Sequence, residues 1–373
     1  PTSALDSLAA LVRDGGLRRV QGDLLVDGSF FREPFLHPDW KPEDLNDAFA
    51  APVAALSLEE NLVTVRVEAG SWVGAQPVIY TSPPRAGIPV DNLAHTAPAG
   101  SRSRIWLLRE NPRDPIGIIG EIPLAGRDVW RRLPVPDPLR FTGLQLKWAL
   151  EARGVEVRGE VVPVRSPSRS RISVRGPDPA TDGGASPRII ATLDSPPLLE
   201  VLRVINKESN NFLAETVIKT LGRVVFGEGS FDAGSRAVRR FLVEEVGAPE
   251  EEIRVRDGSG LSAENQTSAR VLVRTLEYMA ESPDWDQFLE TLPEAGARRE
   301  LRRMYRSPAA GNLRAKTGTM DRVSALSGMV RTRSGERILF SILSNEVRSE
   351  YRAKRAEDRL GIRLASLSRP YPP

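Results

Sequence analysis

The spacing of apolar and polar residues along the chain predicts a mixture of helices and strands. Between Ser3 and Gly15 the apolar residues recur at helical spacing, so this stretch is expected to form an amphipathic helix. Residues 61–68 alternate with the period of two that marks a half-buried strand. By the same criteria, further helices are predicted at 137–153, 196–224, 230–246, 268–282 and 349–366, and further strands at 18–27, 155–164, 312–318, 322–332 and 336–345, with several short strands before about residue 122.

The order of these elements predicts an α+β protein with more than one domain. Short strands and Gly/Pro turns dominate the first half of the chain, whereas long helices followed by paired strands begin at Ser195. Helices that flank an antiparallel sheet form a layered α+β core. Residues 163–187 are rich in Pro, Ser, Arg and Gly and are expected to form a loop or linker.

The composition is that of an ordinary globular protein. Apolar residues make up 40% of the 373 residues and charged residues 27%, with a formal net charge of only +3. Arg and Glu alternate over residues 298–303, which indicates a solvated helix face. A nucleic-acid binder would gather its positive charge into patches with aromatic residues between them. We therefore expect no nucleic-acid partner.

Several kinds of chemistry are excluded or disfavoured. The chain has no cysteine, which rules out a thiol nucleophile, a disulfide framework and a thiolate metal site. His37 and His95 have no partners at metal-ligand spacing, so no metal and no cofactor are expected. Both histidines lie in the first half and no Gly-x-Ser-x-Gly motif occurs, which disfavours a Ser-His-Asp hydrolase. No apolar run is long enough to be a transmembrane helix.

The most informative motif is Lys316-Thr317-Gly318-Thr319. Only six of the 52 basic residues are lysines, so a lysine at this place is not the default cation of the chain. An ammonium is a compact point charge that a guanidinium cannot replace at a crowded site. A glycine in a strand allows the backbone to approach a partner closely. Upstream stands a second motif, Ser209-x-Asn211.

Together with Asp257-Gly-Ser-Gly-Leu-Ser262, these motifs resemble the D-alanyl-D-alanine carboxypeptidase/endopeptidase family, the class C low-molecular-mass penicillin-binding proteins. The resemblance covers essentially the whole chain, with further matching phrases at 20–24, 51–58, 195–198 and 323–328. It implies a serine β-lactamase/transpeptidase-like domain, with helices around an antiparallel sheet, and β-rich accessory domains inserted into it. The expected boundaries are an accessory domain at 1–55 and 126–190, a second one nested at 56–125, and the C-terminal part of the penicillin-binding domain at 191–373.

The resemblance also implies roles for individual residues. Ser209, Asn211 and Lys316 are the expected catalytic residues. The substrate-binding and oxyanion residues are expected to be Thr317, Gly318, Thr319 and Met320. The implied partners are peptidoglycan stem peptides ending in D-Ala-D-Ala, with β-lactams as inhibitors once a nucleophile is present, and the implied location is periplasmic or extracytoplasmic.

Each assignment has a structural alternative. Ser209 is also a plausible helix cap, and Lys316 is also a plausible strand-edge charge. Met320 could equally pack in a core. Asp257 and Ser259 are interpreted as turn residues.

The family's nucleophile is the serine of a Ser-x-x-Lys motif, and this chain does not contain that motif. The residues three positions before the six lysines are Pro38, Leu144, Val204, Thr216, Leu313 and Tyr351. We therefore expect that an N-terminal segment with the nucleophile is missing, and that these 373 residues alone form no acyl-enzyme.

Two other interpretations stay open. One is a non-catalytic protein of the same fold that binds peptidoglycan. It is favoured by two departures from the family pattern, at Ala263 and at residues 296–299. The other is a β-lactamase or esterase of the same superfamily, which the large region before Ser209 argues against.

Overall fold

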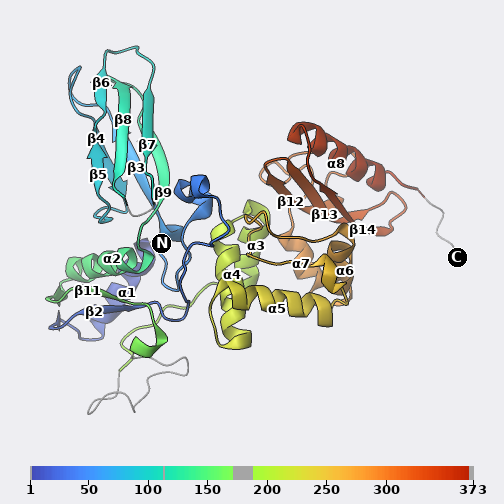
Figure 1. Cartoon of the computed structure of the whole chain (residues 1–373), viewed down its shortest axis with the longest axis horizontal. Helices are drawn as coiled ribbons and strands as arrows, with labels where there is room; N and C mark the ends of the chain where they lie inside the picture. The colour runs from blue at the N-terminus through green and yellow to red at the C-terminus, as the bar shows by residue number, and fades with distance from the viewer. Residues whose placement is uncertain (1, 112–113, 171–187, 369–373) are drawn as a thin grey trace. The chain divides into compact units, whose positions relative to one another are not determined.

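The computed structural model describes residues 2–111, 114–170 and 188–368 and has a mixed α+β fold with several sheets (Figure 1). The chain divides into two compact units. Unit 1 comprises Pro1–Asp194 with Gly227–Ser230, and unit 2 comprises Ser195–Phe226 with Phe231–Pro373. Each unit has its own sheets and its own hydrophobic core.

Unit 1 contains two small sheets that share one core. The first has the order β4-β3-β9, and the second has the order β5-β8-β6 with β7 paired to β8. The inward-facing residues of β3, namely Val63, Val65 and Val67, are fully buried against Ile116 and Ile118 of β8. The strands are β3 (Leu62–Glu68), β4 (Val78–Ser82), β5 (Val90–Asn92), β6 (His95–Ala97), β7 (Arg104–Leu108), β8 (Ile116–Pro123) and β9 (Val129–Pro134). The alternation predicted for residues 61–68 is therefore confirmed, whereas β9 was not predicted because its Arg-rich sequence carries little apolar signal.

The rest of unit 1 is a pair of helices packed beside short parallel strands. Helix α1 packs against α2, which begins after Asp137; the carboxylate of this residue accepts the Arg140 N–H. The elements are α1 (Thr2–Asp14), β1 (Arg19–Val20), β2 (Leu24–Asp27), α2 (Pro138–Ala152), β10 (Glu156–Val157) and β11 (Val161–Val164).

The single strands predicted at 18–27 and 155–164 are each broken in two. Strand β1 pairs with β10 and β2 pairs with β11, both in parallel. The break between β1 and β2 therefore lies beside the break between β10 and β11. A Cβ on Gly159 would lie only 2.3 Å from the carbonyl oxygen of Gly22. The backbones therefore approach too closely at this point to continue as regular strands.

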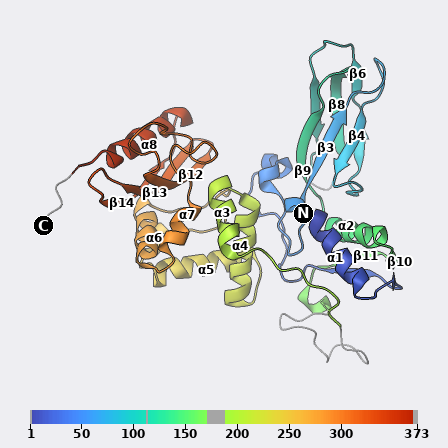
Figure 2. The ribbon, with the colours of Figure 1, turned by 180° about the vertical axis from the view of Figure 1, so that it is seen from behind.

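Unit 2 is built on a three-stranded antiparallel sheet with the order β12-β13-β14. Helix α8 covers one face of this sheet, and α6 lies against the other (Figures 1 and 2). The elements are α3 (Leu198–Glu208), α4 (Asn211–Phe226), α5 (Phe231–Glu244), α6 (Ala269–Glu281), α7 (Trp285–Thr291), β12 (Leu313–Met320), β13 (Val323–Arg331), β14 (Arg337–Ser344) and α8 (Glu350–Ala365). The strands predicted in this unit and the helices predicted at 230–246, 268–282 and 349–366 are present, and α7 is an additional short helix. The helix face expected at 298–303 is wrong, because no helix lies there and Leu301 is buried.

The prediction of one continuous helix over 196–224 is wrong, because the helix is interrupted after Glu208. Ser209 adopts left-handed backbone angles, with φ 53° and ψ 47°. The side chain of Asn210 accepts the Leu213 N–H at 2.9 Å and so caps α4. A side chain that hydrogen-bonds to a backbone N–H competes with the hydrogen bonds of a continuous helix. The Asn210 side chain therefore favours the start of a new helix at this point.

Helix α8 is tied to the sheet by a buried carboxylate. Glu357 is 1% exposed, accepts the Ser324 hydroxyl at 2.6 Å and pairs with Arg303 at 2.9 Å. Replacing one member of a buried charged cluster leaves its partners unpaired in a poorly hydrated place.

We predict that Glu357→Ala lowers the free energy of unfolding by about 3 kcal/mol. The matched control is Lys354→Ala on the same helix, which removes only a surface pair of 3.9 Å with Glu350 and should cost less than about 0.5 kcal/mol. Urea unfolding followed by circular dichroism measures both. Equal unfolding midpoints for the two variants would contradict the structural role of Glu357.

Candidate active site

Ser209 lies at the junction of α3 and α4 in a backbone conformation that non-glycine residues rarely adopt. The left-handed region costs an L-residue roughly 1–2 kcal/mol. Such strain is characteristic of functional positions, because the surrounding structure must hold it. Ser209 is therefore presented at a sharp corner between two helices. It does not cap α4, because Asn210 does.

The structure brings Lys316 to Ser209 across a separation of 107 residues. The Lys316 ammonium donates to Ser209 Oγ at 2.5 Å and to the Thr317 carbonyl oxygen at 2.8 Å. Burial lowers the pKa of Lys316, because a desolvated ammonium is less stable than a hydrated one. A serine hydroxyl that accepts from an ammonium can still donate its own proton to a third group.

A chain of contacts positions the end of α3 beside β12. Lys207, in the last turn of α3, pairs with Glu300 at 2.6 Å. Glu300 also accepts the Glu294 N–H at 2.8 Å. Residues 293–295 in turn hydrogen-bond to the outer edge of β12, through Ala295 N–H to Leu313 O and Ala315 N–H to Pro293 O. The segment 293–301, which contains the expected departure from the family pattern at 296–299, therefore lies beside β12.

Strand β12 is an edge strand, and its outer edge offers backbone groups beyond Ala315. The Ala315 N–H points away from β13, toward Pro293. Because the pattern of an antiparallel strand repeats every two residues, the N–H and C=O groups of Thr317 and Thr319 point to the same side. In the described part of the chain, no backbone partner pairs with these two N–H groups.

The other predicted site residues lie close along the chain to this contact. Asn211 is the first residue of α4, two positions after Ser209. Gly318 and Met320 continue β12 opposite Ala325 and Val323 of β13. The structure thus joins Ser209, Lys316 and Thr317 by hydrogen bonds. Asn211 begins α4, and Gly318, Thr319 and Met320 follow Thr317 along β12.

A buried carboxylate that was not among the predicted site residues lies one turn further along α4. Glu215 is fully buried and accepts the N–H groups of Gly258 at 3.0 Å and Ser259 at 2.8 Å. A Cβ on Gly258 would lie 2.5 Å from the Ala214 carbonyl oxygen, so only glycine fits there. The signal in the sequence was an acidic residue in the buried stripe of α4 that also contains Ile218.

The loop that Glu215 holds is itself built around a carboxylate. Asp257 accepts the N–H groups of Gly260 at 2.9 Å and Ser262 at 2.6 Å, and the Asn265 side-chain amide at 2.8 Å. Burial, together with the negative charge of Asp257, raises the pKa of Glu215 to about 7. The donors from Gly258 and Ser259 oppose that rise. The Asp-Gly-Ser-Gly-Leu-Ser motif is thereby fixed against α4.

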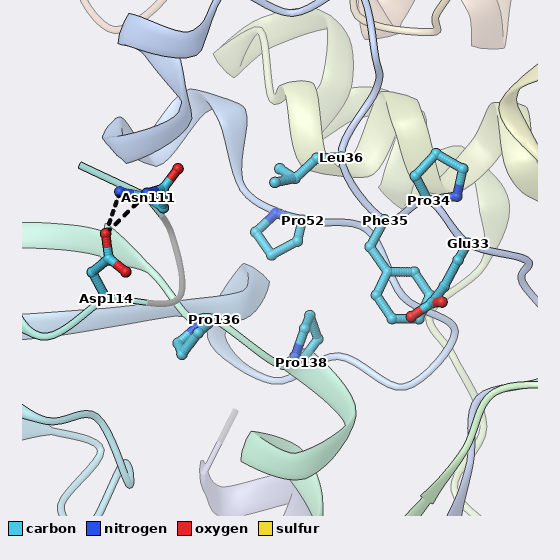
Figure 3. A pocket seen from close by; sticks show the side chains of 9 residues that line it. All are labelled: Glu33, Pro34, Phe35, Leu36, Pro52, Asn111, Asp114, Pro136 and Pro138. Atoms are coloured by element: carbon cyan, nitrogen blue, oxygen red, sulfur yellow. Dashed lines mark hydrogen bonds between the residues drawn. The ribbon is translucent and has the colours of Figure 1, made fainter. Parts of the chain in front are cut away.

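A cavity of about 790 Å³ in unit 1 contains none of the predicted site residues (Figure 3). Two of its polar groups bind each other, since the Asn111 backbone and side-chain N–H groups donate to Asp114 at 2.9 and 3.1 Å. Its lining residues are Glu33, Pro34, Phe35, Leu36, Pro52, Asn111, Asp114, Pro136 and Pro138.

His37 lies 3.9 Å from the Asp39 carboxylate, and His95 lies 3.9 Å from the Glu121 carboxylate. Among the described residues there is no group of three His, Cys, Asp or Glu side chains that could hold a metal ion. Within residues 2–111, 114–170 and 188–368, no helix has both the length and the apolar character needed to cross a membrane.

Comparison with known proteins decides the family. The profile of the D-Ala-D-Ala carboxypeptidase 3 (S13) family matches residues 2–367. The chain belongs to this family. It is thus related to the penicillin-binding carboxypeptidases, and the resemblance carried by the two short motifs is confirmed at the level of the family.

Individual relatives of this S13 family member agree. The D-alanyl-D-alanine carboxypeptidase of Actinomadura sp. (strain R39) is 32% identical over 97% of this chain and 66% of its own length. The carboxypeptidase DacB of Haemophilus influenzae is 24% identical over 90% of this chain and 67% of its own length. The chain therefore spans about two thirds of the length of these relatives.

The fold is similar to that of penicillin-binding protein 4 (dacB) from Haemophilus influenzae. Its crystal structure superposes with a TM-score of 0.81 at 22% identity, over 98% of this chain and 80% of that one. A second crystal structure of that protein, in complex with a β-lactam, superposes with a TM-score of 0.73. The predicted mixed α+β fold is confirmed and is similar to that of this penicillin-binding protein. The transpeptidase-like and accessory domains and the individual site residues remain predictions.

The strain at Ser209 can be tested with two variants. Ser209→Gly and Ser209→Ala both remove the hydroxyl that accepts from Lys316. Only alanine keeps a Cβ in the left-handed conformation, so the glycine variant should be more stable than the alanine variant by about 1 kcal/mol. Denaturant unfolding measures the difference. A more stable alanine variant would show that Ser209 is not held in this conformation.

The raised pKa of Glu215 predicts a pH-dependent stability. Because the folded pKa of about 7 lies above the ordinary value of 4.5, the folded state binds the extra proton between these pH values. This contribution to stability is complete below about pH 4.5 and is lost as the pH rises to about 7, amounting to at most about 3 kcal/mol.

Glu215→Gln should remove this pH dependence. The difference in unfolding free energy between wild type and variant, measured from pH 4.5 to pH 8, should change steadily across this range. Titratable groups that do not interact with Glu215 affect both proteins equally. A difference that stays constant with pH would contradict the prediction.

Proposed function

We propose that this chain is the larger part of a serine-type D-Ala-D-Ala carboxypeptidase/endopeptidase that acts on peptidoglycan stem peptides through an acyl-enzyme. The observation that carries the proposal is the contact between Lys316 and Ser209, a strained serine beside an open strand edge. Family membership supports it. The fold proposed in more detail is a transpeptidase-like domain whose C-terminal part is 191–373. One accessory domain, formed by 1–55 and 126–190, is inserted into it, and a second β-rich accessory domain, 56–125, is nested in the first.

In this proposal the substrate lies along the outer edge of β12. The backbone N–H of Thr319 would donate to the oxyanion, a contribution of roughly 3 kcal/mol for one such donor. The hydroxyls of Thr317 and Thr319 would bind the carboxylate that ends the peptide. Asn211 would bind the substrate's amide group. Gly318 allows the close approach of the two backbones, and Met320 would line the end of the site.

The proposed reaction is two acyl transfers. A serine Oγ attacks the carbonyl carbon of the penultimate D-Ala, and the C–N bond to the last residue breaks. Ser209 relays the serine's proton to the departing amine, helped by the positive charge of Lys316, and D-Ala leaves. Water then attacks the ester carbonyl carbon, the C–O bond to the serine breaks, and the serine Oγ takes up the proton that the water loses. The shortened peptide leaves as a carboxylic acid, and the free serine is restored.

The acylated serine is proposed to belong to a longer form of the protein. No lysine of these 373 residues follows a serine at the Ser-x-x-Lys spacing. Thr216, the nearest candidate by position, donates its hydroxyl to the Phe212 carbonyl within α4, and the lysine three residues later is fully buried. Substrate and fold together imply a periplasmic or extracytoplasmic location.

We predict a covalent benzylpenicillin adduct on the longer natural protein and none on the 373-residue chain. Intact-mass spectrometry after incubation measures both. No adduct on a folded longer form would favour a non-catalytic protein that binds peptidoglycan. An adduct on the 373-residue chain would reveal another nucleophile, with Ser209 the first candidate.

Within the longer form, Lys316→Ala should slow acylation by about 100-fold or more, because it removes the charge beside Ser209. Lys316→Arg should not restore the rate, because a guanidinium cannot occupy the same place. The matched control is Lys354→Ala, which removes a lysine from the surface of α8. Equal rates for the Lys316 and Lys354 variants would refute the role of Lys316.

A further inference from the structure

A row of two aromatic rings and one guanidinium crosses the outer face of the β4-β3-β9 sheet in unit 1. Arg66 at the centre of β3 is directly opposite Tyr80 of β4 on one side and Trp130 of β9 on the other. The inner face of the same strand is the fully buried valine core, so these three side chains point outward. Tyr80 is 43% exposed and Trp130 is 54% exposed.

Four groups hold the guanidinium of Arg66 in place. Its central carbon lies 4.1 Å from the Tyr80 ring centroid and 5.4 Å from that of Trp130. Its two terminal nitrogens pair with Glu68 at 3.4 Å and with Asp128 at 3.3 Å. Cation–π contacts and ion pairs together keep the row ordered before any ligand arrives.

The neighbouring positions on this face are polar. One step along the sheet, Thr64 is opposite Ser82 on β4 and Arg132 on β9. Hydroxyls and a second cation therefore lie next to the aromatic row. The face offers separated rings, hydrogen-bond acceptors and hydrogen-bond donors on one sheet.

This combination matches the chemistry of a sugar polymer. A pyranose ring presents C–H bonds on its faces, which pack against the electron-rich face of an aromatic ring, and hydroxyls at its rim. Carboxylates accept hydrogen bonds from hydroxyls, and guanidinium groups donate to their oxygens. Tyr80 and Trp130 lie on either side of β3, about two strand spacings or roughly 10 Å apart, comparable to the length of a disaccharide.

Other large partners fit less well. Tyr, Trp and Arg are enriched at protein–protein interfaces, but Glu and Asp are depleted there, whereas the carboxylates of Glu68 and Asp128 flank the arginine at the centre of this row. A nucleic acid would bring phosphates close to Glu68 and Asp128, which would repel them. A neutral or weakly anionic glycan meets neither obstacle.

We propose that the outer face of the β4-β3-β9 sheet, centred on Tyr80, Arg66 and Trp130, binds a polysaccharide. Its identification as the glycan strand of peptidoglycan rests on the proposed function. Binding the glycan would raise the local concentration of the stem peptides attached to it, which strengthens a weak peptide interaction without any new contact to the peptide.

The test measures glycan binding and acylation separately. The 373-residue chain is sedimented with insoluble peptidoglycan and, in a second arm, titrated with soluble glycan strands from which the stem peptides have been removed. The variants are Trp130→Ala, Tyr80→Ala and the double variant. The conservative variant Trp130→Phe keeps a ring at the position. Thermal unfolding shows that each variant is folded.

The matched control is Trp106→Ala. Trp106 has a similar exposure, 51%, but lies on β7 of the other sheet, where its direct cross-strand partner is Ile119 and not an arginine. We expect the double variant to bind stripped glycan at least 10-fold more weakly than wild type. Trp106→Ala should bind like wild type, and Trp130→Phe should fall between the wild type and Trp130→Ala.

The proposal is overturned if the folded double variant binds stripped glycan like wild type, or if Trp106→Ala loses binding equally. It is also overturned if the chain sediments with intact peptidoglycan but does not bind the stripped glycan strands. Analytical ultracentrifugation without glycan provides a further check, because self-association that the double variant abolishes would also overturn the proposal. Benzylpenicillin acylation of the longer form should be unchanged in the double variant. Loss of glycan binding with intact acylation, or the reverse, separates this proposal from the proposed function.

Discussion

The hydrogen bond from Lys316 to Ser209 is the contact on which the arrangement of unit 2 around the candidate site depends. It joins a helix junction to a sheet edge that lies 107 residues further along the chain. Both partners are held in costly states, because Ser209 has a left-handed backbone and Lys316 is partly desolvated. Such states persist only where the surrounding contacts are strong enough to impose them.

Those surrounding contacts are mainly buried or half-buried carboxylates. Glu300 connects the end of α3 to the segment beside β12, and Glu215 connects α4 to the Asp-Gly-Ser-Gly-Leu-Ser loop. On the opposite face of the sheet, Glu357 connects α8 to β13. Each accepts hydrogen bonds from several donors, and this compensation makes burial of a carboxylate possible. The candidate site is thus supported by directional polar contacts as well as by apolar packing.

Unit 1 follows a different principle. Its β-sandwich is held by a core of Val and Ile side chains, and its charged groups lie on the outside. The row formed by Tyr80, Arg66 and Trp130 is therefore not needed to build that core. If both proposals hold, the two units divide the recognition of one polymer, with sugar bound by unit 1 and peptide by unit 2.

The sequence alone determined the elements that depend on local pattern. The amphipathic helix α1, the alternating strand β3 and the three strands of the unit 2 sheet follow from side-chain period. Two short motifs were sufficient to indicate the family. Gly318 allows another backbone to approach the strand closely, and Lys316 supplies a compact positive charge, and few other residues could do either.

Only the tertiary structure decided where those elements break and which side chains meet. The helix ends before Ser209 because the Asn210 side chain binds the backbone and Lys316 holds the serine, and no helical period reports either event. Strand β9 exists because β3 pairs with it, although its own residues carry a weak strand signal. The burial of Glu215 follows from contact with a loop 43 residues away. Side-chain period reports only which face of an element is apolar, whereas these features arise from contacts between residues far apart in the sequence.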